Sequence, residues 1–242
     1  MKASKIDGRI FAENLRKKVR QAVTELPNSP ALAVVLVGED PASQVYVASK
    51  VKFTEECGMN SLEYKLPADT KETEVVNLVK KLNENDRVDG ILVQLPLPKG
   101  INSDNVIKEI HPDKDVDGLT EASAGRLSLG KSGLRPCTPT GCVMLAKDEL
   151  GDLSGKHCVV LGRSILVGKP AALLFLEQNC TVTIANGKII MPEAIIEKEN
   201  ILSGSNFYGS NVLHFRSNSI NESTVEDTKE EKINNPPGLN TR

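Results

Sequence analysis

The sequence predicts an α/β fold with a mainly parallel sheet, divided into two domains. Short apolar runs rich in β-branched residues alternate with segments of helical period. One of these runs, VDGILVQLPLP at residues 88–98, ends in a single amide, Gln94, and turns through two prolines. Its apolar part lacks polar alternation, as is typical of a parallel strand covered on both faces. Because ligands bind beyond the carboxyl ends of parallel strands, Gln94 is a candidate site residue.

The first half of the chain alternates helices and strands. Apolar residues at helical spacing predict a helix over 10–26, and the run ALAVVLV at 31–37 predicts a strand that Gly38 closes. Asp40 and Pro41 then supply the N-cap and first residue of a helix over about 42–57. The pattern continues with strands at 61–66 and 88–95 and helices at 70–85 and 103–110. Residues 113–140 are irregular and rich in Gly and Pro, so we place the domain boundary there.

The second half contains one βαβ unit. It is predicted from a helix at 140–150, a strand at 157–162, a helix at about 169–178 and a strand at 180–184. An amphipathic piece at 192–202 fits a helix and the start of a strand. Residues 203–242 are rich in Ser and Asn and poor in apolar residues, which predicts a disordered tail without strands. The predicted divisions are therefore 1–138, 139–202 and 203–242.

The composition favours a globular protein that acts on small molecules. The 30 basic and 32 acidic residues leave a net charge of -2, so no electrostatic footprint for nucleic acid is predicted. The longest apolar run, at 31–37, is far shorter than the roughly 18 residues that span a bilayer, and no apolar signal segment opens the chain. The five cysteines lack CxxC spacing and the three histidines are scattered, so neither a disulfide framework nor a metal site is predicted. We expect a cytoplasmic protein without membrane association.

Tyr46 and Lys50 are the first pair of candidate site residues. They are four positions apart on a predicted helix, hence on one face, just after the carboxyl end of a strand. Such a pair is more often a half-buried ring beside a solvated amine. Gln94 favours the functional interpretation, because it ends a neighbouring strand.

The acidic segment HPDKDVDGL is a second candidate. Asp113, Asp115 and Asp117 alternate before Gly118 like the start of a calcium loop, but Ala124 stands where such a loop needs Glu. A simple Asp-Gly turn and a ligand-binding carboxylate both remain open from the residues alone.

The third candidate is the glycine-bounded turn GRSILVG at 162–168. Between a strand and a helix, it would direct backbone N–H groups and the positive helix end toward a phosphate, although it is not GxGxxG. Simple strand-to-helix packing is the alternative. Arg163 favours a ribose 2′-phosphate, hence NADP over NAD. The candidate cofactor-binding residues are Gly162, Arg163, Ser164 and Gly168.

These segments together resemble a known family. The matching stretches, in order, are GEDPASQVYVASKVK at 38–52, VDGILVQLPLP at 88–98, PDKDVDGLTEASAGRL at 112–127, LRPCTPTGC at 134–142 and GRSILVGKP at 162–170. They are similar to the bifunctional methylenetetrahydrofolate dehydrogenase and methenyltetrahydrofolate cyclohydrolase family, called FolD in bacteria. The resemblance covers about residues 5–184, and a weaker similarity continues to Leu202.

The resemblance implies a three-layer α/β folate-binding domain, a Rossmann-like NADP-binding domain and a cleft between them. Lys50 would be the principal catalytic group, Tyr46 would stack on the folate, Gln94 would orient Lys50 and Asp117 would hold the pterin. The implied reactions are hydride transfer from 5,10-methylenetetrahydrofolate to NADP and hydrolysis of the methenyl product, with neutral Lys50 as base. A homodimer and a place in one-carbon metabolism and purine biosynthesis are also implied.

The sequence departs from the family near the end of the βαβ unit. The family has the segment CHSKT here, whose serine helps to hold the NADP 2′-phosphate. The aligned residues of this chain are Ala185, Asn186, Gly187, Lys188 and Ile189. Nothing in 203–242 matches the family's later segments, so a truncated nucleotide domain with an exposed sheet edge is expected. The alternatives are a folate-binding pseudoenzyme or a cyclohydrolase with impaired NADP binding. NAD use stays open, and an unrelated dehydrogenase of the shikimate type would leave the Tyr46, Lys50, Gln94 and Asp117 set unexplained.

Overall fold

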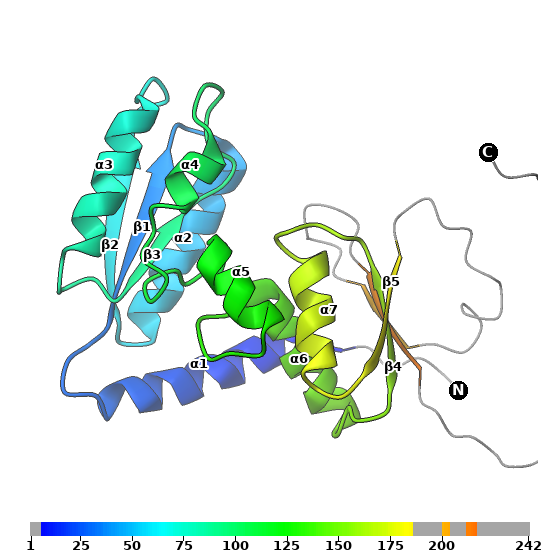
Figure 1. The fold of residues 1–242 in the computed structure, drawn as a ribbon. Helices are drawn as coiled ribbons and strands as arrows, with labels where there is room; N and C mark the ends of the chain where they lie inside the picture. Colours follow the sequence, from blue (N-terminus) through cyan, green and yellow to red (C-terminus); the bar gives the residue numbers. More distant parts are fainter. Residues whose placement is uncertain (1–5, 186–199, 204–211, 217–242) are drawn as a thin grey trace, which may run out of the picture.

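The structure, a computed structural model, consists of two layered α/β units, each built on its own sheet (Figure 1). It describes residues 6–185, 200–203 and 212–216. The first sheet is parallel, with the order β2-β1-β3. Its strands are β1 (Ala31–Val37), β2 (Asn60–Leu66) and β3 (Gly90–Val93). The central strand β1 is almost entirely buried, as its unbroken apolar sequence predicts.

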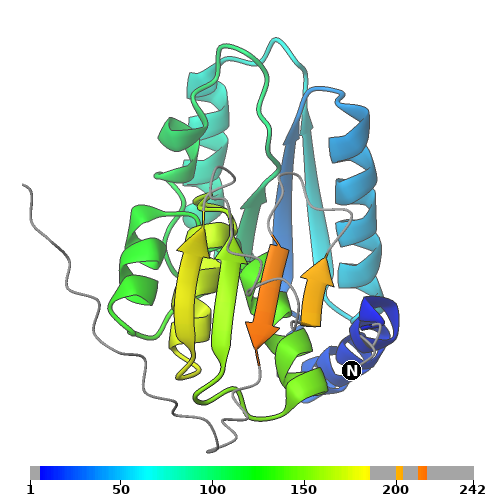
Figure 2. The same cartoon turned by 90° about the vertical axis from the view of Figure 1, so that its right-hand side faces the viewer.

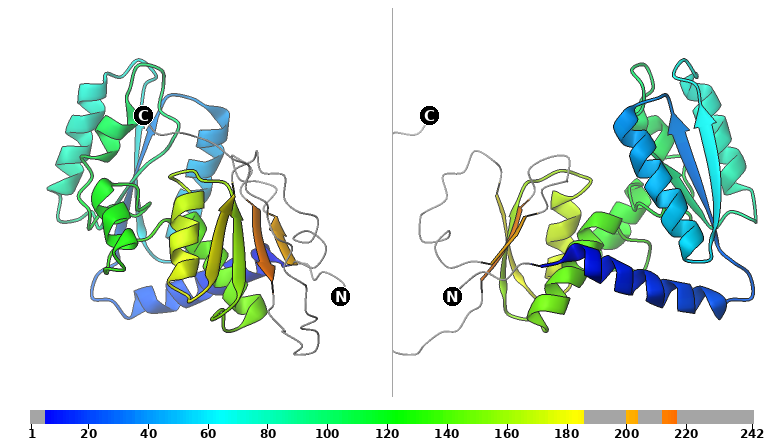
Figure 3. Two further views of the ribbon diagram at one scale, coloured as in Figure 1. Left: turned by 45° about the vertical axis from the view of Figure 1, so that its right-hand side comes forward. Right: turned by 180° about the vertical axis from the view of Figure 1, so that it is seen from behind.

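Helices cover both faces of the first sheet. On one face lies α2 (Pro41–Glu56), where Val47 packs with Val34 and Leu36. On the other face lie α3 (Glu72–Asn83) and α4 (Ser103–Ile107) (Figure 1). The three layers confirm the predicted fold class of the first unit. Beneath it runs α1 (Gly8–Thr24), whose first turn Asp7 caps (Figure 3).

The second unit is built around the predicted βαβ unit. Its elements are α6 (Cys137–Leu150), β4 (His157–Leu161), α7 (Gly168–Leu176) and β5 (Thr181–Ala185). The strands β4 and β5 are parallel, and Phe175 of α7 is fully buried in the cluster that joins α6 and α7 to the sheet. The parallel βαβ arrangement agrees with the expected Rossmann-like domain.

Two further strands complete the second sheet. The strands β7 (Val212–Arg216) and β6 (Asn200–Ser203) give the order β5-β4-β7-β6, side by side in Figure 2. Both the β4–β7 and the β7–β6 pairs are antiparallel. The expectation of a strandless tail is therefore wrong at 212–216, where VLHFR contains three apolar residues that pair with β4. The rest of 203–242 and most of 192–202 lie outside the described residues, and the domain bounds 1–138 and 139–202 stay predictions.

A helix also interrupts the stretch predicted to be irregular. α5 (Glu121–Ser128) lies between the two units in Figure 1 and contacts α7. Thr120 caps it by accepting a 3.1 Å hydrogen bond from the Ser123 N–H. The sequence contains this capping pattern, but Gly125 and the surrounding glycines favoured irregular structure, so no helix was predicted here. Within the described parts of the chain, no helix combines the length and apolar content that a membrane span requires.

Candidate functional site

The structure brings Lys50 and Gln94 into direct contact. The Lys50 Nζ donates a 3.1 Å hydrogen bond to the Gln94 Oε1, and the Gln94 Nε2 donates to the Leu95 carbonyl at 2.6 Å. The backbone N–H of Gln94 also bonds to the Val35 carbonyl at 2.9 Å, which ties this residue to the end of the sheet. Both of the amide's polar atoms are thus engaged, so the Gln94 side chain is fixed and in turn fixes the lysine ammonium.

α2 delivers two of the predicted site residues. Its N-cap, Asp40, accepts a 2.8 Å bond from the Ser43 N–H, and this bond lowers the pKa of the Asp40 carboxyl. Pro41 provides a preset first helical residue. Tyr46 is 43% exposed, and Lys50 follows it by one turn. The two side chains are therefore presented from one helical face, as predicted.

The three aspartates of the acidic segment have separate roles. Asp113 is exposed and pairs with Arg126 at 2.8 Å. Asp115 is only 1% exposed, and its two carboxylate oxygens accept the N–H groups of Leu119 and Thr120 at 3.1 and 2.8 Å. Asp117 is partly buried and interacts with the charges of Lys50 and Asp115. The three carboxylates therefore do not converge on one point, as the calcium-loop alternative would require. Asp117 is the carboxylate that the site can use.

A close backbone approach places Cys137 beside Asp117. Gly118 has a φ of 63°, and a Cβ there would lie 2.8 Å from the Pro136 nitrogen. Only glycine fits this contact. The Cys137 thiol, at the start of α6, donates to the Val116 carbonyl at 3.4 Å and lies within the influence of the charge of Asp117. Cys137 was not among the predicted site residues, because the cysteines lack CxxC spacing and so carried no signal for a site.

Burial dominates the electrostatics of this cluster. It raises the pKa of the Asp117 carboxyl, and the charge of Asp115 adds to that effect, while Lys50 and the Cys137 thiol oppose it. Burial, followed by the charge of Asp117, also raises the pKa of the Cys137 thiol. The cluster thus combines a lysine, an aspartate that resists ionisation and a protonated thiol.

A cleft of about 620 Å³ opens beside these groups. Tyr46 and Gln94 line it, and the turn after β3 supplies an apolar floor through Leu95, Pro96 and Leu97. Leu166 of the 162–168 turn lines it from the second unit. The cleft therefore lies at the carboxyl end of the first sheet, between the two units, as expected for a parallel α/β fold.

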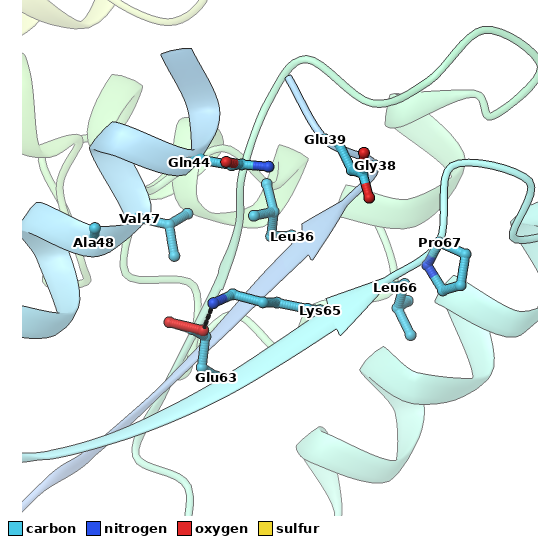
Figure 4. A pocket seen from close by; sticks show the side chains of 10 residues that line it. All are labelled: Leu36, Gly38, Glu39, Gln44, Val47, Ala48, Glu63, Lys65, Leu66 and Pro67. Atoms are coloured by element: carbon cyan, nitrogen blue, oxygen red, sulfur yellow. Dashed lines mark ion pairs between the residues drawn. The ribbon is translucent and has the colours of Figure 1, made fainter. Parts of the chain in front are cut away.

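A second hollow, of about 530 Å³, lies on a different flank of α2 (Figure 4). Gln44 and Val47 border it from α2, and an ion pair between Lys65 and Glu63 of β2 crosses it. None of the predicted site residues lines this hollow. Two of them, Tyr46 and Gln94, line the cleft, so the cleft rather than this hollow adjoins the predicted site.

The four candidate cofactor-binding residues form one tight turn between β4 and α7. Gly162 has a φ of 125°, and a Cβ on Gly168 would lie 2.4 Å from the Gly162 carbonyl oxygen. The Ser164 hydroxyl accepts the Val167 and Gly168 N–H groups, both at 3.2 Å, and Arg163 is exposed. Ser164 thus accepts the first N–H of α7, a structural role that was not predicted from the sequence. Ala185 ends β5, and residues 186–189 lie outside the described residues.

Comparisons with family models agree with this geometry. Residues 6–117 match the model described as the catalytic domain of tetrahydrofolate dehydrogenase/cyclohydrolase, and residues 136–207 match its NAD(P)-binding domain. The chain is similar to the bifunctional protein FolD of Hyphomonas neptunium, 65% identical over 189 residues that cover 78% of this chain and 64% of the relative. It is 51% identical to the FolD protein of Phenylobacterium zucineum over 206 residues, which cover 84% and 69% of the two chains. The chain thus spans somewhat less than two thirds of the length of the first of these relatives.

Solved structures show the same arrangement. The FolD enzyme of Campylobacter jejuni superposes with a TM-score of 0.74 at 38% identity, covering 81% of this chain and 70% of that one. The dehydrogenase-cyclohydrolase of Trypanosoma brucei, solved with NADP and an inhibitor, gives a TM-score of 0.73 at 31% identity, covering 78% and 66%. The family resemblance predicted from the sequence motifs is confirmed by these matches.

Proposed function

Because the chain belongs to the tetrahydrofolate dehydrogenase/cyclohydrolase family, we propose that it oxidises 5,10-methylenetetrahydrofolate with NADP and hydrolyses the methenyl product to 10-formyltetrahydrofolate. The observation that carries this proposal is the Lys50–Gln94 hydrogen bond of 3.1 Å beside Asp117. Lys50, Gln94 and Asp117 would supply a base, a neutral orienting group and a carboxyl at one edge of a parallel sheet. The activity would serve one-carbon metabolism.

In the hydrolytic step, Lys50 is the residue suited to move a proton. Water attacks the carbon that bridges two nitrogens of the substrate, and a base must accept the proton that the water loses. Gln94 holds the lysine nitrogen without adding a charge. Asp117, with its raised pKa, can donate as well as accept a hydrogen bond to the pterin ring. Tyr46 offers an aromatic face at the wall of the same cleft.

The turn at 162–168 fits a dinucleotide phosphate in its backbone shape. Gly168 allows α7 to begin against Gly162, so the helix N-terminus lies next to the turn. Arg163 is exposed where it could pair with a 2′-phosphate, which supports NADP. The Ser164 hydroxyl already accepts the N–H groups of Val167 and Gly168, so it would contact a phosphate in addition to them. When bound there, NADP supplies the acceptor for the hydride, while the protein aligns donor and acceptor.

A narrower function is the second candidate. In the second sheet β4 has an antiparallel neighbour, β7, on one side. If this sheet does not bind NADP, the first unit would support a cyclohydrolase without dehydrogenase activity or a folate-binding pseudoenzyme.

An absorbance assay separates these functions. Purified chain is mixed with 5,10-methylenetetrahydrofolate and an excess of NADP or NAD, and reduced nicotinamide is followed; 5,10-methenyltetrahydrofolate is supplied in a parallel reaction. Hydride transfer together with hydrolysis supports the bifunctional enzyme. Hydrolysis alone supports the cyclohydrolase, and folate binding without either reaction supports the pseudoenzyme.

We also propose a cytoplasmic homodimer whose 10-formyl product supports purine biosynthesis. All five cysteines are free thiols, which fits a reducing compartment. The outer strand β5 carries Ile184, which is 49% exposed and available to a second copy. Sedimentation velocity at several concentrations tests the dimer, because a single monomeric species throughout would contradict it.

A further inference from the structure

The cofactor turn contributes one side chain to the substrate cleft. Of the residues that line the cleft, ten come from the first unit and one, Leu166, comes from the turn between β4 and α7. Leu166 is 47% exposed, so about half of its surface is left for a ligand to cover. Its neighbour Ile165 is more exposed, at 68%, and does not line the cleft.

The chemistry of the cleft indicates what Leu166 would contact. Tyr46 is 43% exposed, and the turn after β3 adds Leu95, Pro96 and Leu97, so the cleft walls are mainly apolar. Such walls suit a flat aromatic ring system, with polar groups such as Gln94 fixing its orientation. Lys50 and Asp117 lie outside the lining of this cleft. The cleft therefore extends the site away from the reacting groups.

We propose that Leu166 is a substrate-binding residue that forms the second unit's wall of the folate cleft. This inference rests on the proposed function, since it assumes that a reduced folate occupies the cleft. It also gives the turn at 162–168 two ligands, because Gly162, Arg163 and Ser164 would hold the cofactor while Leu166 touches the substrate. The side chain that closes the cleft thus comes from the loop that binds the cofactor.

Direct binding tests the role of Leu166 without requiring turnover. Isothermal titration calorimetry with 5-formyltetrahydrofolate, a stable reduced folate, is run on the full chain and on Leu166→Ala. We expect about fivefold weaker binding, equivalent to about 1 kcal/mol. Leu166→Met keeps the side-chain volume and should restore most of the affinity. Ile165→Ala is the matched control and should bind as the unaltered chain does.

The outcomes separate the two proposals. If the unaltered chain binds 5-formyltetrahydrofolate and Leu166→Ala binds it equally well, the Leu166 wall is refuted and the proposed function stands. If Ile165→Ala weakens binding as much as Leu166→Ala, the effect belongs to the turn as a whole and the assignment to Leu166 falls. If the unaltered chain shows no binding, the folate function itself is overturned, and the wall with it. Thermal unfolding of both alanine variants shows whether each is folded.

Discussion

The two units present their ligand edges in different ways. In the first, three parallel strands direct their carboxyl ends to one edge, where Gln94 meets Lys50 at 3.1 Å. In the second, β5 is the one described strand that pairs with β4 in parallel, and the antiparallel β7 pairs Val212 with Leu161. A parallel neighbour would end at the same edge, whereas β7 begins there. A nucleotide crevice normally lies where parallel strands diverge, so the second unit offers a less regular site.

This difference separates the two activities. The proposed hydrolytic groups belong to the complete edge of the first unit, and they need no residue of the second sheet. Hydride transfer also requires the turn at 162–168 to hold a cofactor. Damage to the first edge should therefore abolish hydrolysis, while damage to the second should remove only cofactor-dependent chemistry.

Replacing Lys50 should have the largest effect. In Lys50→Met the aliphatic stem remains but the base is lost, so hydrolysis of 5,10-methenyltetrahydrofolate should fall by at least about 100-fold. Lys52→Met, on the same helix, is the control, because the Lys52 side chain is 68% exposed and its described contacts are Glu56, at 3.8 Å, and the Phe53 ring, at 5.9 Å. The decay of methenyl absorbance measures the rate. Unchanged hydrolysis in Lys50→Met would remove this residue from the mechanism.

Gly168→Ala should damage the second unit selectively. The new Cβ would lie 2.4 Å from the Gly162 carbonyl oxygen, and overpacking of this kind costs about 1–3 kcal/mol. We expect NADP titration to show the larger loss of affinity, while 5-formyltetrahydrofolate binding weakens by no more than the about fivefold expected for Leu166→Ala. Gly141→Ala in α6 is the control, since nothing lies within 4 Å of its Cβ position. Equal loss of both ligands would mean that the units are not separable in this way.

Gln94→Glu should test the neutral character of the first edge. A carboxylate at the 3.1 Å contact would hold Lys50 as a charged ammonium, so hydrolysis should fall about tenfold or more. Its rate should also recover toward higher pH. Gln44→Glu adds the same charge at the exposed Gln44 of α2, which borders the hollow of Figure 4, and should leave hydrolysis unchanged. A normal rate in Gln94→Glu would contradict the orienting role.

The same contrast explains which parts of the structure could be predicted. Strands and helices of the first unit follow the sequence pattern because apolar period and local caps specify them, as with Asp40 before α2. Tyr46, Lys50 and Gln94 could be singled out because they stand near strand ends. The strand β7 was missed, since its five residues form a strand by pairing with β4 and β6, and the contact with β4 is distant in sequence.

Side-chain environments were the other feature that could not be predicted from the sequence. The sequence offered three alternating aspartates, but only the folded chain distinguishes Asp115, which is buried and bonded to two N–H groups, from Asp117. Cys137 and Leu166 were missed because each reaches the site through a turn. One signal was available for Cys137: Gly118 follows Asp117, and such a glycine permits the close approach to Pro136.

The smallest predicted effect concerns the pH dependence of stability at Asp117. Burial raises the pKa of this carboxyl above 3.8, so its favourable contribution to folding is complete below that value and is lost as pH rises through the raised pKa. Asp117→Asn does not ionise, and should therefore unfold about 2–4 °C higher than the unaltered chain at pH 8 but not at pH 4.

Asp113→Asn provides a control of opposite sign. The hydrogen bond from Arg126, followed by its charge, lowers the pKa of Asp113, so this carboxylate stabilises the fold above 3.8 and loses that contribution as pH falls. Asp113→Asn should then unfold lower than the unaltered chain at pH 8 and still at pH 4, and the difference should disappear only as pH falls below 3.8 through the lowered pKa. Thermal melts across this range measure both variants. A lower melting temperature for Asp117→Asn at pH 8 would show that the ionised carboxylate stabilises the site, because its attraction to Lys50 would then exceed the cost of burial.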